Sequence, residues 1–185
     1  MKKTIAMLLV MILCIGMLAG CGGKKSGGEA PGKEESKGEI YDAGNVQMLV
    51  PEGWVAFPVM DIIAEDPNTE DPDSINICKD AKSEFDLLTK PSIQISYYGP
   101  GFDMMKPDKS WYENAEDVAD MTIGKYTWTG FTADDFGGDK MAILWTEDGD
   151  HQYQAVVYLE LSEGSVTLED ADVQAALGSV APSGN

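Results

Sequence analysis

The sequence predicts one α+β domain, in which a mostly antiparallel sheet of about six strands is flanked by two or three helices. Three observations carry this expectation: segments that alternate between apolar and polar side chains, an Asp-Gly hairpin signal, and two segments with helical spacing of apolar residues. We place the domain at residues 39–182 of the 185-residue chain. No internal repeat interrupts it, which excludes solenoids and propellers.

The first predicted strands lie in the N-terminal half of the domain. Residues 46–50 alternate, Pro51-Glu52-Gly53 forms a tight turn, and residues 54–57 continue as a second strand, which together indicate a β-hairpin. Residues 93–98 form a third strand that Gly99-Pro100-Gly101 ends. Each of these strands has one apolar face to bury, because successive side chains of a strand point to opposite faces.

The C-terminal half is richer in strand signals. Residues 125–131 are dense in threonine and aromatic residues and predict a fourth strand. Residues 141–145 and 151–161 are joined by Glu147-Asp148-Gly149-Asp150, which predicts a hairpin. A short edge strand is expected at residues 165–168.

Two segments predict helices. Ser110 followed by Glu113 matches a capping box, and apolar residues then recur at helical spacing at Trp111, Ala115, Val118 and Ala119. A second capping pattern, from Thr167 to Asp170, opens a predicted helix over residues 170–177.

The N-terminus predicts export and lipid attachment. Two lysines precede a 14-residue apolar run over residues 5–18, which is too short to span a bilayer and is typical of a signal peptide over residues 1–20. The run ends in Leu18-Ala19-Gly20-Cys21, which resembles the lipobox of bacterial lipoproteins. The resemblance implies that Cys21 carries a thioether-linked diacylglycerol and becomes the mature N-terminus.

The segment after Cys21 predicts a flexible tether over residues 21–38, because it contains glycine, serine, lysine and glutamate with no large apolar side chain. Two acyl chains give durable attachment where one does not. The sequence therefore predicts a protein anchored in the cell membrane through lipid, with its domain on the extracytoplasmic face.

The charge of the chain excludes one class of partner. Lys and Arg number 13 against 32 Asp and Glu, which gives a net charge of −19, and loss of Lys2 and Lys3 with the signal lowers it to −21. The chain contains no arginine. Nucleic acid is not expected as a partner, because phosphate neutralisation needs clustered basic residues.

The sequence offers little material for catalysis, and we predict no enzyme activity, catalytic residue or cofactor. His151 is the sole histidine, and no Gly-x-Ser-x-Gly nucleophile motif accompanies it. Cys78 lies in an apolar β-like stretch and is expected to be a buried, inert thiol. One histidine and one unmodified cysteine cannot complete a zinc site. Four tryptophans are expected in the core rather than in a sugar-binding cleft: Trp54, Trp111, Trp128 and Trp145.

The acidic stretch of residues 66–73 is a weak calcium candidate. Its oxygen ligands would come from Asp66, Asn68, Glu70 and Asp73. It departs from an EF-hand because Asp71 stands where glycine makes the turn and Ile77 where a bidentate glutamate closes the shell. A solvated acidic turn is the favoured interpretation, and weak calcium binding stays open.

The order of these motifs resembles the PsbP-like (Mog-like) superfamily over about residues 40–181. The resemblance rests on Val50-Pro51-Glu52-Gly53-Trp54, the Ile-x-Ile strand at residues 93–95, Ile123-Gly124-Lys125 and the closing segment of residues 172–180. It implies a central antiparallel sheet between helices that serves as a non-catalytic binding or assembly module. It supplies no catalytic residues.

Together these features predict a membrane-anchored extracytoplasmic lipoprotein that acts as a binding or accessory module for an envelope protein or complex. An alternative is a receptor that binds a small ligand or a cation such as calcium for a transporter. A carboxylate-dependent hydrolase is a third interpretation, for which the sequence offers no defined acid pair.

Overall fold

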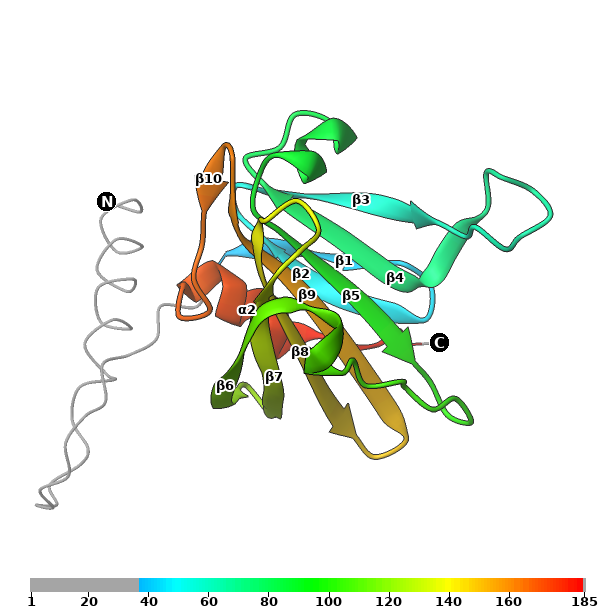
Figure 1. Ribbon diagram of the computed structural model, residues 1–185. Helices are drawn as coiled ribbons and strands as arrows, with labels where there is room; N and C mark the ends of the chain where they lie inside the picture. The colour runs from blue at the N-terminus through cyan, green and yellow to red at the C-terminus, as the bar shows by residue number, and fades with distance from the viewer. Residues whose placement is uncertain (1–36, 185) are drawn as a thin grey trace, which may run out of the picture. The chain divides into compact units, whose positions relative to one another are not determined.

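The computed structural model describes residues 37–184 (Figure 1). The predicted signal peptide, the lipobox with Cys21 and residues 22–36 of the tether lie outside the described residues. β1 begins at Gly38, the last residue of the predicted tether. None of the helices within residues 37–184 has the length and apolarity that a membrane crossing requires.

The described chain forms two antiparallel sheets and one α-helix. The small sheet has the order β1-β2-β11, and the large sheet runs β3-β4-β5-β9-β8-β7-β6 with β10 paired to β9. The strands are β1 Gly38–Asp42, β2 Val46–Pro51, β3 Trp54–Met60, β4 Glu70–Lys79, β5 Ser92–Tyr98, β6 Glu113–Ile123, β7 Tyr126–Asp134, β8 Lys140–Asp148, β9 His151–Leu161, β10 Gly164–Ser165 and β11 Ala181–Pro182. The helix is α2 Ala171–Ser179, and the 3₁₀ turns are η1 Glu84–Leu88 and η2 Lys109–Trp111.

This architecture corrects the predicted fold class. Two or three helices were expected beside about six strands, whereas residues 37–184 contain one α-helix and eleven strands in two sheets. The predicted strands at residues 93–98 and 125–131 are confirmed as β5 and β7, and the Asp-Gly hairpin is confirmed as the β8–β9 pair. The helix predicted at residues 170–177 is confirmed as α2, with Asp170 at its N-cap position.

The helix predicted after Ser110 is wrong, because that segment is the edge strand β6. Only the short turn η2 is helical, and its cap is Asp108, whose side chain accepts a hydrogen bond from the Ser110 amide at 2.8 Å. Two irregularities in the pairing of β6 with β7 each place three residue steps of β6 opposite two of β7. Each bulge adds one residue. The more sheltered side chains of β6 therefore recur every third position, at Ala115, Val118 and Met121, and imitate a helical period.

The hairpin predicted across Pro51-Glu52-Gly53 is also wrong. The two strands form as expected, but β2 pairs with β1 and β11, whereas β3 pairs with β4. The turn carries the chain from one sheet to the other. Gly53 has a φ of 85°, a backbone conformation that glycine adopts without steric cost.

One face of the large sheet is closed by the small sheet and α2, which lie behind it in Figure 1. Val46 and Met48 from β2, together with Val173 and Leu177 from α2, belong to the same buried cluster as the isoleucines of β4 and β5. The Tyr126 hydroxyl donates a hydrogen bond to the Val180 carbonyl and joins β7 to the end of the helix. We call this the covered face.

The opposite face of the large sheet divides into two halves. Over β4 and β5 it presents polar side chains such as Asn76, Gln94 and Ser96, as expected for a solvated sheet face. Over β7, β8 and β9 it carries a second apolar cluster built on Phe131, Ala133, Met141 and Ile143. In Figure 1 the green segment that precedes β6 crosses in front of this half, and no α-helix lies over it. We call this the open face.

Candidate functional site

The open face holds an apolar depression of about 560 Å³, which we call the aromatic groove. Its floor comes from alternate residues of β8 and β9, with Ile143 and Val156 among them. Four aromatic residues form its rim: Trp111 and Tyr112 before β6, Phe136 in the turn before β8, and Tyr158 from β9. The floor side chains reach the groove because strand periodicity sends every second residue of β8 and β9 to this face.

The rim is held in place by local hydrogen bonds. In the β7–β8 turn, Asp135 Oδ1 accepts hydrogen bonds from the amides of Gly137 and Asp139 at 2.7 and 3.0 Å. The Asp135 amide in turn donates to the Asp139 carbonyl at 3.0 Å. This closed turn presents Phe136, whose side chain is fully exposed. The backbone that carries the exposed ring is therefore ordered, so binding would order the side chain alone.

The opposite rim is packed against the apolar cluster below it. The rings of Tyr112 and Phe131 are 5.5 Å apart between centroids, and Phe131 meets Trp145 edge-on at 6.2 Å. Trp111, in η2, keeps 58% of its surface exposed. This corrects the expectation that all four tryptophans lie in the core: Trp54 and Trp128 are buried there, Trp145 is half-buried on the open face, and Trp111 is exposed.

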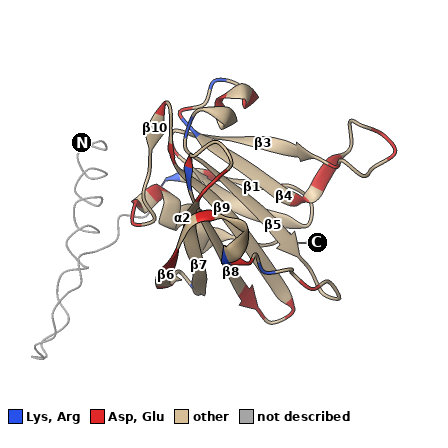
Figure 2. Cartoon of the chain, viewed as in Figure 1, with Lys and Arg blue, Asp and Glu red and all other residues tan. Residues whose placement is uncertain are grey.

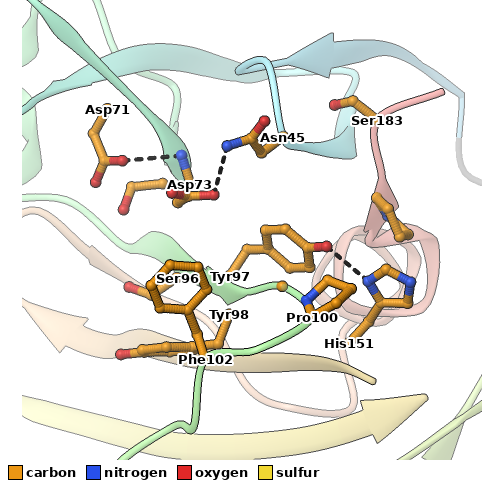
Figure 3. Close-up of a pocket in the computed structure, with 13 residues that line it drawn as sticks. Asn45, Asp71, Asp73, Ser96, Tyr97, Tyr98, Pro100, Phe102, His151 and Ser183 are labelled. Carbon is orange, nitrogen blue, oxygen red and sulfur yellow. Dashed lines mark hydrogen bonds between the residues drawn. The ribbon is translucent and has the colours of Figure 1, made fainter. Parts of the chain in front are cut away.

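A second hollow of about 710 Å³ lies where β4 begins, β5 ends and β9 begins. We call it the Tyr97–His151 pocket (Figure 3). The Tyr97 hydroxyl and His151 Nδ1 share a hydrogen bond of 2.7 Å, and their rings stack at 5.8 Å between centroids. The pKa of Tyr97 is raised, first by burial and then by the negative charge of Asp73.

The wall of this pocket is fixed by one glutamine. Gln152 Oε1 accepts from the Met104 amide at 3.1 Å, and Gln152 Nε2 donates to the Phe102 carbonyl at 3.2 Å. These two bonds attach the loop after β5 to β9. Figure 3 shows the Phe102 ring beside the Tyr98 phenol on one side of the pocket, with Asp73 and Asn45 on another.

The contacts in this pocket do not bring a nucleophile and a general base together. His151 is half-buried and is hydrogen-bonded to a tyrosine rather than to a serine or cysteine. Cys78 is confirmed as buried and free, and burial is the main cause that raises its pKa to about 11. A thiol in that state is almost entirely protonated at neutral pH and is a poor nucleophile.

The four calcium candidates are placed on two different elements. Asp66 and Asn68 lie in the β3–β4 loop, where Asp66 Oδ1 accepts from the Asn68 amide and side chain at 2.9 Å each. Glu70 and Asp73 belong to strand β4 rather than to the expected loop, and Asp73 Oδ1 accepts from Asn45 Nδ2 at 3.0 Å. Within residues 37–184, no group of three or more His, Cys, Asp or Glu side chains is arranged to hold a metal ion.

No family model matches the chain, and no curated protein matches it.

The sequence contained one usable signal for the aromatic groove. Phe136 interrupts the acidic turn Asp134-Asp135-Phe136-Gly137-Gly138-Asp139. A large apolar side chain inside a polar turn has no core to enter. Such a residue is expected to be exposed, as Phe136 is.

Proposed function

We propose that this protein is a lipoprotein held by Cys21 on the extracytoplasmic face of the cell membrane, and that its domain is a non-catalytic binding or accessory module for an envelope protein. The observation that carries the proposal is the aromatic groove, with exposed Trp111 and Phe136 at its rim. Tryptophan and tyrosine dominate the energetic centres of protein interfaces. A groove of this kind on an ordered sheet face supports a docking role.

The membrane surface is a weaker candidate for the same groove. Exposed aromatic rings also insert into bilayer interfaces, but here Glu113, Asp134 and Asp135 line the same hollow. Anionic lipid headgroups would repel these carboxylates if the groove lay against the membrane. Figure 2 shows acidic residues in most loops of the domain and few lysines. A protein partner is therefore favoured over lipid.

The proposal is tested by placing a photo-cross-linking amino acid at Phe136 in the full-length protein in cells. The matched control carries the same group at Phe85, another exposed aromatic residue, which lies in η1 outside the groove. A second control, Cys21→Ala, removes the predicted site of lipid attachment. We expect a discrete product with one envelope protein, identified by mass spectrometry, from position 136 and not from position 85, and less of it without Cys21. Absence of a product at 136, or adducts to lipid alone, would overturn the proposal.

A receptor for a small cationic solute is a second candidate, and the Tyr97–His151 pocket favours it. Asp71 and Asp73 line this pocket, and neither forms an ion pair with any lysine of the described chain. The test is calorimetric titration of the full-length protein with calcium chloride and with a simple primary amine. Saturable binding that Asp73→Asn abolishes would support the receptor, and heats that stay at the level of dilution would exclude it.

A further inference from the structure

The aromatic groove combines ring surfaces with negative charge. Among the described side chains that line it are three carboxylates, those of Glu113, Asp134 and Asp135, and no lysine. Asp134 is partly compensated by Lys140, whose Nζ is 3.9 Å from it. No ion pair within residues 37–184 involves Glu113 or Asp135. The groove is thus lined mainly by apolar side chains and carries a negative charge.

The ring of Tyr158 lies in this negative field. Its pKa is raised, first by burial and then by the carboxylates of Asp135 and Asp139. The same field attracts a cation, and the faces of Trp111, Tyr112 and Phe136 attract it further, because an aromatic face carries partial negative charge. Both effects strengthen when a partner excludes water from the groove.

We infer that the aromatic groove binds a polypeptide segment of the partner in which a lysine or arginine is flanked by large apolar side chains. The inference rests on the proposed function as a protein-binding module and names the chemistry of that partner. The basic head would lie among the rings and near Glu113, and the flanking apolar side chains would cover the exposed rings of Trp111 and Phe136.

The size and shape of the groove favour a segment over a single small cation. A volume of about 560 Å³ lies in the range of sites that bury several groups at once. Phe136 is fully exposed at the outer rim and Trp111 keeps 58% of its surface exposed, so a lone ammonium group would leave most of both rings in water. A chain with apolar neighbours on each side of the cation covers them.

The net charge of −19 acts in the same direction at longer range. A strongly acidic protein steers basic partners toward it and repels acidic ones. The net charge alone does not determine where on the surface a basic partner binds. The experiment must therefore separate the groove from the overall charge.

The test measures binding of three fluorescein-labelled peptides to the full-length chain in detergent by fluorescence anisotropy. The peptides have twelve residues with leucine at alternate positions and lysine, glutamine or glutamate at the others. The groove variant is Trp111→Ala with Glu113→Gln, and the matched control is Phe85→Ala with Glu84→Gln in η1. Each double variant removes one exposed ring and one carboxylate, so both change the net charge equally.

The inference expects the lysine peptide to bind at least tenfold more tightly than the glutamine peptide, and the glutamate peptide not to bind. The groove variant should lose at least tenfold in affinity for the lysine peptide, against less than twofold for the control variant. Equal losses in both variants would assign the binding to overall charge and overturn the inference. Equal binding of the glutamine peptide, or equally tight binding of N-acetyl-lysine methylamide, would also overturn it.

Failure here is distinguishable from failure of the proposed function. A cross-link from position 136 to an envelope protein through a neutral or acidic segment would keep the docking role and refute the basic segment. Absence of any cross-link would refute the docking role itself.

Discussion

The two faces of the large sheet are built by the same strands and differ in what covers them. On β8, Ala142 and Leu144 point to the covered face and are buried against β2 and α2, whereas Met141 and Ile143 point to the open face. The covered face is closed by elements of the chain itself. On the open face, the apolar cluster over β7, β8 and β9 is also buried, but it lies beneath a single loop segment, and the rings of Trp111 and Phe136 stay exposed above it.

The largest effect is expected on the covered face. Trp128 has no exposed surface and meets Tyr126 edge-on at 6.2 Å between ring centroids. Trp128→Ala should lower the free energy of unfolding by roughly 3–5 kcal/mol, the range for a buried aromatic residue that leaves a cavity. Denaturant titration of the full-length protein measures it. A loss below about 1 kcal/mol would mean that this face is not closed as described.

An intermediate effect on the free energy of unfolding is expected from ionisation of Cys78. This residue alternates along β4 with Ile75 and Ile77 of the covered face, so its side chain lies on the opposite face of the sheet. Its burial beside η1 raises the pKa to about 11 from 9.0. The unfolded thiol ionises first, so the contribution of Cys78 to stability is complete below about pH 9 and is lost as the pH rises toward 11.

Thiol modification at pH 8 measures the state of Cys78 directly. The native protein should react far more slowly with a thiol reagent than the protein in denaturant, because the buried thiol is protonated and shielded. The variant Cys78→Ala should lose the slow reaction, because the sulfur of Cys21 is blocked in the proposed lipidated protein. Rapid modification of native Cys78 would show that η1 does not seal this part of the sheet.

The smallest effect on stability is expected on the open face. Trp111→Ala and Phe136→Ala should each change the free energy of unfolding by no more than about 0.5 kcal/mol, because both side chains are exposed. Their effect on partner capture should be large at the same time. If either substitution destabilised the domain as much as Trp128→Ala, the aromatic groove would be part of the core and the contrast between the faces would fail.

How much of the fold the sequence predicts depends on which contacts the strands make. Local signals succeed where neighbours in sequence pair, as in β8 and β9, whose turn contains Gly149 with a φ of 64°. They fail at Pro51-Glu52-Gly53, where the turn forms but each flanking strand pairs with its other neighbour along the chain, β2 with β1 and β3 with β4. They also fail at β6, where bulges set by pairing with β7 create a period of three residues.

The candidate site was less predictable than the fold. Residues such as Trp111 and Tyr158 are more than forty positions apart and line one groove because the segment before β6 crosses the face formed by β7, β8 and β9. Single-sequence periodicity assigns both to a core, since it cannot tell which face of a sheet stays uncovered. Phe136 was the one exception, because its acidic turn leaves it no buried position.

The doubly bulged β6 has a consequence for crowding. As an outer strand of the large sheet it offers unpaired backbone groups, through which two copies of a sheet protein can join edge to edge. The bulges break the regular spacing of those groups, and Glu116, Asp117 and Asp120 place like charges along the same strand. Copies concentrated side by side on one surface would therefore repel each other at this edge and remain separate molecules.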